Sequence, residues 1–362
     1  MTPAVGNAPA LRSPRGVFAL ERPRWPHLWM LAVFCLPLLG LPFALTGRSG
    51  EQWQRISSLS ASGPVRQIVW AVTPAQRALY VVVEHWGIFR SDDGGLRWQP
   101  LRYRLPRGSL EQIAVGPLAL APDDSQFLLV GVPDQAARGR PPLYKSGNGG
   151  QSWVPRRGLG THDVEGLAIA PGGLAFAASD RRFYRSADAG DSWLEVGTLP
   201  VARRVLAMAL DGTPGPIYVG TAGDGLVVTP DEGVSWRAAL PGRSVYALAT
   251  AGPGRVYAAA DDGLHFSGDR GESWRQLLPP EAQGAVVALS VCVGPPDVLF
   301  VAPAGKPVHY STDGGTTWRP LHDRLLGAPV TALAASILAE ELDLFVGTQR
   351  GLWRCTLPAA TS

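Results

Sequence analysis

Eight carboxylic acids at predicted loop positions of this 362-residue sequence are candidates for acid–base chemistry. Hydrolysis of a glycosidic bond by that chemistry needs two carboxyl groups that face each other across the bond. The eight acids are spread over five segments of the chain, and such acids are also ordinary residues of solvated turns. The sequence therefore favours structural roles and leaves hydrolysis as the alternative. The eight are Glu84, Asp134, Asp163, Glu165, Asp180, Asp224, Asp261 and Asp262.

Arginine supplies nearly all the positive charge, because only two of the 33 basic residues, Lys145 and Lys306, are lysines. A guanidinium group recognises carboxylates and phosphates through two parallel hydrogen bonds. Clustered arginines would therefore suit an acidic protein surface as partner, although arginine also serves as generic surface charge. The candidate partner-binding residues are Arg102, Arg104, Arg138, Arg140, Arg156, Arg157, Arg181, Arg182, Arg203 and Arg204.

The sequence gives no indication of a metal, a cofactor or a nucleic-acid partner. Three cysteines and six histidines show no metal-ligand spacing, and no glycine-rich phosphate loop follows a strand. The net charge of +3 depends on the first 50 residues, which carry five arginines and one glutamate. Of the total 33 basic and 30 acidic residues, the remainder keeps 28 and 29. We therefore predict a nearly neutral domain that binds neither metal nor nucleic acid.

An eight-residue pattern recurs six times, most clearly as Ser-Thr-Asp-Gly-Gly-Thr-Thr-Trp at residues 311–318. Its Asp or Asn side chain can accept hydrogen bonds from the backbone N–H groups just ahead and close a hairpin. The Gly two places later allows positive φ, and the Trp suits packing between neighbouring sheets. We therefore predict structural roles for Asp93, Asn148, Asp188, Asp231, Asp269 and Asp313, and for Trp98, Trp153, Trp193, Trp236, Trp274 and Trp318.

The six copies resemble the Asp-box, also called the bacterial neuraminidase repeat. This repeat occurs in sialidases, sortilin-type receptors, some xyloglucanases and the photosystem II stability/assembly factor family. The resemblance implies an all-β propeller fold.

The motif tryptophans lie 55, 40, 43, 38 and 44 residues apart, close to the length of a four-stranded blade. We attribute the long first step to an insertion at 133–142. A seventh unit after Trp318 has three predicted strands and no Asp-box. Its fourth strand is predicted at the other end of the chain, because Trp53 lies 45 residues before Trp98. Residues 51–362 are therefore predicted to form a seven-bladed β-propeller, closed by residues 53–59 as outer strand of the last blade.

Residues 28–47 form an uncharged run of 20 residues, long enough to span a bilayer as a helix. Four arginines precede this run, which predicts a cytoplasmic N-terminus. We predict a transmembrane anchor at 27–47 behind a disordered cytoplasmic tail at 1–26. A cleaved signal peptide is the alternative. Either way, the propeller is expected to be periplasmic or extracellular, at the cell membrane.

Two families frame the expected function. Sialidases rely on an Arg triad, a Tyr–Glu pair and an Arg-Ile-Pro segment, and this chain has no Arg-Ile-Pro. Xyloglucanase-type enzymes use two propellers, whereas this chain has room for one. Its blade number, Asp-boxes and arginines resemble the photosystem II stability/assembly factors. The resemblance implies a non-enzymatic protein-binding scaffold or membrane-complex assembly factor, with an exported glycoside hydrolase as the alternative.

The propeller scheme also predicts how charge is distributed. Loops between the second and third strands share one face with the connections between blades, and the Asp-box hairpins lie on the other. The scheme places the candidate arginines on the first face and the Asp-box acids on the second.

Overall fold

The computed structural model describes residues 51–357, with short gaps. The gaps are residues 60, 62, 73–76, 102–103, 106–107, 110–114, 134–140, 161, 213–214, 279–281, 323–324, 326 and 339–340. The predicted tail at 1–26, the predicted anchor at 27–47 and most of the predicted insertion lie outside the described residues. Within the described part, no helix is both long and apolar enough to cross a membrane.

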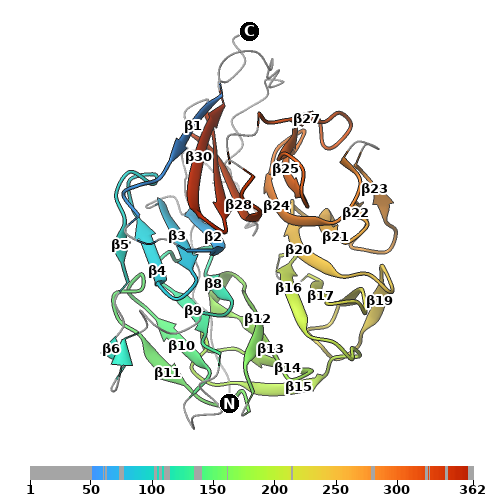
Figure 1. The fold of residues 1–362 in the computed structure, drawn as a ribbon. Coiled ribbons are helices and arrows are strands. Elements are labelled where there is room, and N and C mark those ends of the chain that lie inside the picture. The colour runs from blue at the N-terminus through green and yellow to red at the C-terminus, as the bar shows by residue number, and fades with distance from the viewer. Residues whose placement is uncertain are drawn as a thin grey trace, which may run out of the picture.

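Seven four-stranded antiparallel sheets stand as blades around a central axis (Figure 1). Blade 1 contains β2 (Val65–Val72), β3 (Arg77–Val83), β4 (Gly87–Ser91) and β5 (Gln99–Pro100). Blade 2 contains β8 (Leu118–Leu120), β9 (Leu128–Gly131), β10 (Leu143–Ser146) and β11 (Val154–Arg156). Blade 3 contains β12 (Val164–Ile169), β13 (Ala175–Ser179), β14 (Arg182–Ser186) and β15 (Leu194–Thr198). Blade 4 contains β16 (Val205–Leu210), β17 (Ile217–Thr221), β18 (Leu226–Thr229) and β19 (Arg237–Ala239).

The remaining strands complete the ring. Blade 5 contains β20 (Val245–Thr250), β21 (Val256–Ala260), β22 (Gly263–Ser267) and β23 (Arg275–Gln276). Blade 6 contains β24 (Val286–Cys292), β25 (Val298–Pro303), β26 (His309–Ser311) and β27 (Arg319–Pro320). Blade 7 contains β28 (Val330–Leu338), β29 (Glu341–Thr348), β30 (Gly351–Leu357) and β1 (Gln52–Arg55). A small hairpin, β6 (Arg104–Leu105) with β7 (Gly108–Ser109), follows blade 1, and a short 3-10 helix spans Pro171–Gly173.

The last blade closes the ring as predicted, because β1 pairs antiparallel with β30. Trp53 lies opposite Cys355, and Arg55 lies opposite Trp353. The two strands, near opposite ends of the chain, lie side by side in Figure 1. The strand is shorter than predicted: it ends at Arg55, after which Ile56 N donates one more hydrogen bond to Leu352 O. Ile56 and Leu59 then turn inward and are buried between blades 7 and 1.

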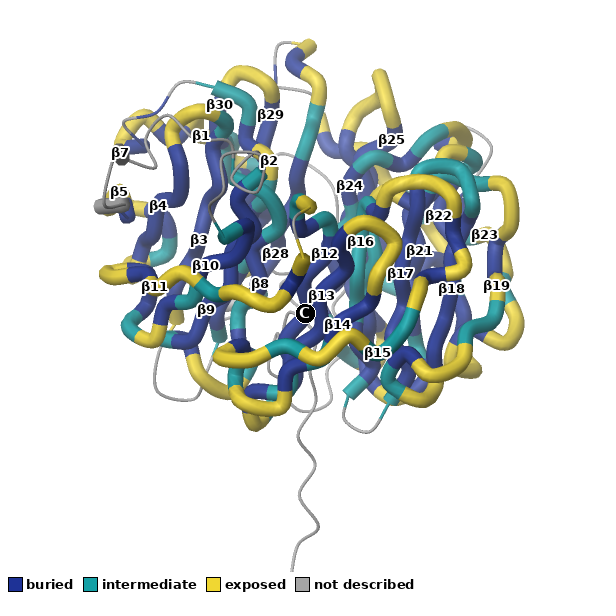
Figure 2. Tube along the Cα trace, turned by 90° about the horizontal axis from the view of Figure 1, so that it is seen from below, coloured by how far each residue is buried: buried dark blue, intermediate teal, exposed yellow. Residues whose placement is uncertain are grey.

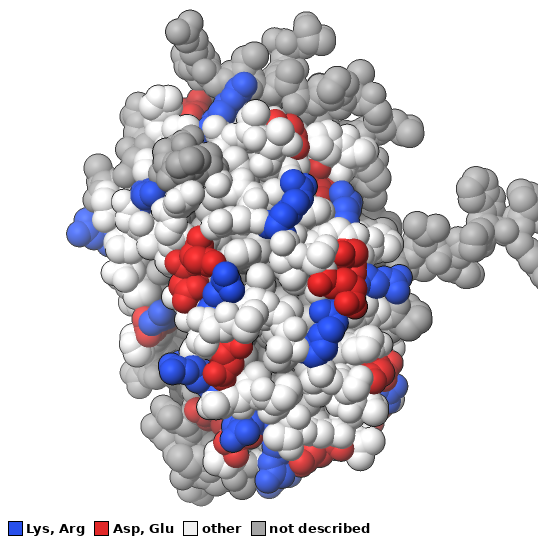
Figure 3. All heavy atoms as spheres, turned by 90° about the vertical axis from the view of Figure 1, so that its right-hand side faces the viewer, with Lys and Arg blue, Asp and Glu red and all other residues white. Residues whose placement is uncertain are grey.

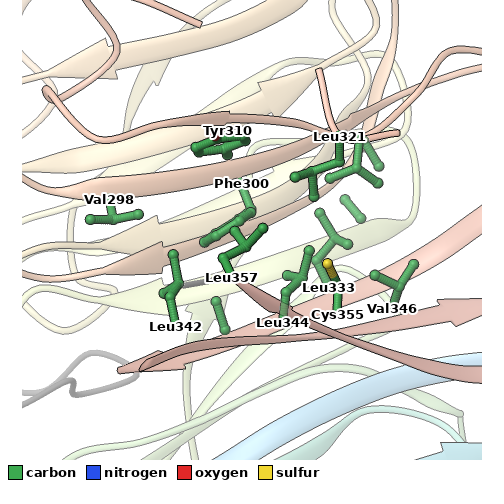
Figure 4. Packing of buried hydrophobic residues seen from close by; sticks show 14 of the residues in the cluster. Val298, Phe300, Tyr310, Leu321, Leu333, Leu342, Leu344, Val346, Cys355 and Leu357 are labelled. Atoms are coloured by element: carbon green, nitrogen blue, oxygen red, sulfur yellow. The ribbon is translucent and has the colours of Figure 1, made fainter. Parts of the chain in front are cut away.

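Each blade buries both faces of its middle strands, as the dark inner strands of Figure 2 show. One apolar cluster fills each contact between neighbouring blades, and Figure 4 shows the cluster between blades 6 and 7. There Phe300 from β25 meets Leu333, Leu344 and Cys355 from β28, β29 and β30. Burial of such side chains contributes about 1.5–3 kcal/mol each.

The motif tryptophans occupy a repeated place in these clusters. Each one packs against the apolar cluster that its blade shares with the preceding blade. Trp53 takes the same place between blades 6 and 7, although its blade has no Asp-box. The others are Trp98, Trp153, Trp193, Trp236, Trp274 and Trp318.

Candidate functional site

Two sets of loops divide the ring into two faces. The loop face carries the turns between second and third strands and the connections between blades, such as Ala222 and Ser244, which form a β-bridge. The box face carries the Asp-box hairpins and the turns between the first and second strands of each blade. In blade 6, Gly314 N–H of the hairpin donates to Asp297 O of the turn at 3.1 Å, so the two lie side by side. These contacts confirm the predicted division of the loops.

The Asp-box of blade 5 shows the contacts that hold each hairpin. Ser273 donates to the Asp269 carboxylate from its backbone N–H at 2.9 Å and from its hydroxyl at 2.5 Å. Ser267 donates to the same carboxylate at 2.7 Å and accepts the Gly271 N–H at 2.7 Å. Trp274 Nε1–H donates to Gly271 O at 3.0 Å, which fixes the indole against the turn.

All six boxes repeat the contact between the Asp or Asn oxygen and the N–H four residues later. In the Asn148 box the amide takes both roles, accepting from Ser152 N and donating to Ser152 Oγ at 2.8 Å. Hydrogen bonds from the Ser273 side chain and backbone lower the pKa of Asp269 to about 2. These contacts hold each box hairpin closed.

The loop-face carboxylates are held by local partners. Glu84 forms an ion pair with Arg66 at 2.6 Å, and Glu165 accepts the Val205 N–H at 2.9 Å. Asp180 lies 3.2 Å from a ring nitrogen of His162.

The carboxylates of blades 4 and 5 show the same pattern. Asp224 Oδ2 accepts the Ala202 and Arg203 N–H groups, both at 2.7 Å. Asp261 accepts the Ser244 N–H at 3.0 Å. Asp262 binds Arg243 at 2.5 Å and His265 at 2.7 Å.

The partners of Asp262 act against proton donation from its carboxyl group. Burial opposes ionisation of Asp262, but the hydrogen bonds from Arg243 and His265 outweigh it and lower its pKa. Among the described carboxyl groups with a resolved shift, the pKa is raised only at Asp211, because burial outweighs the hydrogen bond from Gly254 N. Asp211 lies on the box face, away from the candidate acids. Asp163 also has an interaction partner, and Asp134 lies outside the described residues.

The structure does not describe the side chains of four of the ten candidate arginines. Arg102, Arg138 and Arg140 lie outside the described residues, and only the backbone of Arg104, in β6, is described.

Three others are occupied by carboxylates. Arg182 binds Glu195 at 2.9 Å, and Arg203 lies 4.0 Å from Asp224. Arg156 binds Asp191 at 2.7 Å. Arg156 lies opposite Leu143, at the loop-face end of β10, but its side chain reaches the Asp-box of blade 3, to which Asp191 belongs.

The last three, Arg157, Arg181 and Arg204, are exposed. None of them forms an ion pair with another residue that the structure describes. Arg181 occupies the β13–β14 turn, and Arg204 immediately precedes β16. These three side chains are the part of the predicted patch that remains open to a partner.

The predicted separation of charge between the faces is incomplete, because the box face carries its own arginines. Arg90 binds Asp92 at 2.7 Å, and Arg237 binds Glu272 at 3.1 Å. Figure 3 shows basic and acidic groups side by side on the side of the ring that is on the right in Figure 1. Strand residues were not included in the prediction, and their side chains also reach the hairpins: Arg90 of β4 reaches the hairpin of its own blade, and Arg237 of β19 reaches that of the next blade.

A central channel with a cavity volume of about 1030 Å³ runs between the innermost strands. Six of these strands carry a β-bulge at their loop-face end, where the pairing with the second strand shifts. Bulges turn a side chain away from the regular alternation of a strand and are frequent beside functional sites. The six bulged residues line the channel mouth: Arg66, Glu165, Leu206, Tyr246, Val287 and Thr331. These six residues form a collar around the channel mouth, and no pattern in the sequence predicts it.

An ion pair between a buried carboxylate and a partly exposed guanidinium in blade 7 was also not predicted. Arg354 donates to both oxygens of Asp343, at 3.0 and 2.6 Å, and Thr356 donates to the same carboxylate at 2.8 Å. Asp343 is buried, so the pair lies within the sheet that closes the ring. The sequence signal for this ion pair was the lack of an Asp-box in the seventh unit. In that unit, polar contacts other than those of an Asp-box join β29 and β30.

Fold and hairpins together define a seven-bladed β-propeller built from Asp-box repeats. Residues 309–320 match the family described as BNR/Asp-box repeat. No curated protein sequence matches the chain significantly.

Several solved structures share the fold. The chain is similar to YCF48 from Cyanidioschyzon merolae, with 14% sequence identity and a TM-score of 0.61 over 83% of this chain and 98% of that one. It is similar to YCF48 bound to D1 peptide, with 16% identity and a TM-score of 0.60 over 88% and 100% of the two chains. A GH74 xyloglucanase from Xanthomonas campestris gives 22% identity and a TM-score of 0.65, over 84% of this chain and 53% of the enzyme. This chain spans about half the length of that enzyme.

Proposed function

We propose that the protein is a non-enzymatic binding scaffold that takes an acidic protein partner on its loop face, in the assembly of a membrane complex. The observation that carries the proposal is the contrast between the two kinds of charged residue on that face. The described candidate carboxylates have local partners, whereas Arg157, Arg181 and Arg204 are exposed and form no ion pair within the described residues. Such arginines can donate hydrogen bonds to the carboxylates of a partner protein.

The fold similarity to YCF48 bound to D1 peptide supports a protein partner, although it extends to the fold alone. Membrane anchoring through residues 28–47, with a periplasmic or extracellular propeller, belongs to the same proposal and rests on the sequence. The anchor would hold the scaffold beside a membrane complex.

The loop-face arginines can be tested by combined charge reversal. We expect Arg157→Glu, Arg181→Glu and Arg204→Glu together to weaken binding of a labelled Asp/Glu-rich peptide about tenfold or more, which is about 1.4 kcal/mol. Fluorescence anisotropy measures the affinity, and binding by the parent protein should fall with added salt. The matched control reverses Arg77, Arg97 and Arg270, which are exposed on the box side. Equal losses in both triple variants, or none in the first, would refute this site.

The alternative, a glycoside hydrolase, is supported only by the fold shared with the xyloglucanase. Assays on xyloglucan and aryl sialosides separate the two functions. Turnover by the parent protein that disappears in Asp261→Asn or Asp262→Asn would show that the protein is a hydrolase and not a scaffold. We expect no turnover.

A further inference from the structure

The collar of six bulged residues around the channel mouth has a polar half and an apolar half. The polar half is bonded within the ring. Arg66 binds Glu84 at 2.6 Å, Glu165 accepts a backbone N–H of blade 4 at 2.9 Å, and Thr331 donates to a backbone carbonyl of blade 1 at 2.5 Å. These polar side chains therefore already serve contacts between or within blades.

The apolar half-collar consists of Leu206, Tyr246 and Val287, which come from the consecutive blades 4, 5 and 6. Their strands β16, β20 and β24 follow one another along one side of the ring opening (Figure 1). Leu206 and Val287 are partly exposed, and Tyr246 is 37% exposed. All three line the channel mouth, where bulges present them outside the regular alternation of their strands. They therefore form an exposed contact surface with an aromatic ring at its centre.

An open positive charge accompanies this surface. Arg204 also lines the mouth, and its exposed side chain forms no ion pair with another residue that the structure describes. Hydrogen bonds connect its strand to that of Tyr246. Ala222 donates its N–H to Arg204 O at 3.0 Å and forms a β-bridge with Ser244. Since Ser244 comes two residues before Tyr246, the cation and the ring stand on neighbouring strands whose relative position is fixed.

We propose that the apolar half-collar anchors one aromatic side chain of the partner, next to a partner carboxylate that binds Arg204. This inference rests on the proposed function and specifies the chemistry of its acidic partner. Tyrosine and arginine are among the residue types that contribute most to protein–protein binding, usually where an apolar centre has a polar rim. An aromatic ring packed on Tyr246, between Leu206 and Val287, gains both buried apolar area and a ring–ring contact. An acidic segment without such a residue would leave the half-collar in water.

Two labelled peptides of equal length and charge test the inference on the full chain in lipid nanodiscs. Both are rich in Asp and Glu, and one has a central Phe where the other has Ala. Fluorescence anisotropy should show that the parent protein binds the Phe peptide about fivefold or more tightly than the Ala peptide, as expected for one well-packed aromatic contact. Tyr246→Ala should remove this preference and leave the affinity for the Ala peptide unchanged.

Matched variants show whether the preference depends on the half-collar. Tyr246→Phe retains the ring and should retain the preference. Leu96→Ala removes a side chain that is 63% exposed on a box hairpin, and it should also retain the preference. Arg204→Glu should weaken the binding of both peptides, because both carry the carboxylates.

The outcomes separate the aromatic anchor from the acidic partner. Equal binding of the two peptides to the parent, or an unchanged preference in a folded Tyr246→Ala protein, would overturn the anchor and leave the acidic partner standing. Binding of neither peptide would overturn the acidic partner, and the anchor with it. If Tyr246→Ala does not fold, Val287→Ser in the neighbouring blade replaces it, and an unchanged preference in that variant would overturn the anchor.

Discussion

At the scale of the residue, each box aspartate accepts hydrogen bonds from groups that only a folded hairpin presents. Asp269 shows the consequence, because these bonds lower its pKa from 3.8 to about 2. A carboxylate with a lowered folded-state pKa stabilises the fold above its unfolded pKa and loses that contribution as the pH falls toward the folded value. The contribution is therefore complete above about pH 4–5 and disappears progressively as the pH falls to about 2.

Asp269→Asn isolates this effect, because Asn148 shows that the amide fits the same turn. The variant should be less stable than the parent at pH 7, and the difference should shrink as the pH falls from about 4 to about 2. Urea unfolding followed by tryptophan fluorescence at several pH values measures it. A difference that stays constant over this range would mean that the charge of Asp269 contributes nothing.

The ion pair of Asp343 and Arg354 gives a second prediction at this scale. Arg354→Met should cost about 3–5 kcal/mol, because the buried Asp343 loses its charged partner inside the sheet. Replacing both residues by Leu and Met should cost much less, since no unpaired charge remains. Chemical denaturation of Asp343→Leu, of Arg354→Met and of the double variant, compared with the parent, forms a double-mutant cycle. Additive costs would show that the pair acts as two independent residues.

At the scale of the element, the closing strand β1 joins the N-terminal part of the propeller to blade 7. Removing residues 51–60 would expose the edge of β30 and remove the Trp53, Ile56 and Leu59 side chains from two apolar clusters. We expect that deletion to abolish the cooperative thermal transition, whereas deletion of residues 1–26 should leave it unchanged. Trp53→Ala should cost about 2–3 kcal/mol, because the indole is only partly buried. A shortened protein that melts like the parent would show that the ring closes without β1.

The same element shows how far the sequence predicts the structure. Repetition made the blades visible: a Trp at a regular interval identified every Asp-box, and Trp53 revealed the closing strand. The end of β1 at Arg55 was not predictable, because Ile56 and Leu59 leave the sheet to fill the contact with blade 1. The collar bulges and the Arg156–Asp191 pair were missed for the same reason. They depend on the contacts between neighbouring blades, and the repeat pattern in the sequence does not predict those contacts.

At the scale of the whole molecule, the direction of β1 decides which face of the ring would lie nearer the predicted anchor at 27–47. Gln52 pairs with Thr356 near the box face, and the strand then runs toward the loop face, where Arg55 lies beside Trp353. Residues 48–51 separate this start from the predicted span. Fully extended, such a linker reaches roughly 14 Å. If residues 28–47 are the anchor, the box face lies near the bilayer, and the loop face with Arg181 points away from it.

Two single-cysteine labels test this orientation in reconstituted membranes. Thr316→Cys places a fluorophore on a box hairpin of blade 6, and Arg182→Cys places one beside the β13–β14 turn of the loop face. Both positions are exposed, and the described native cysteines, Cys292 and Cys355, are buried. A quencher confined to the lipid phase should reduce the fluorescence at position 316 and spare position 182, because only the first lies within reach of the headgroups. Equal quenching would show that the propeller tumbles freely on its linker, and preferential quenching at position 182 would mean that the loop face, with its open arginines, lies against the membrane.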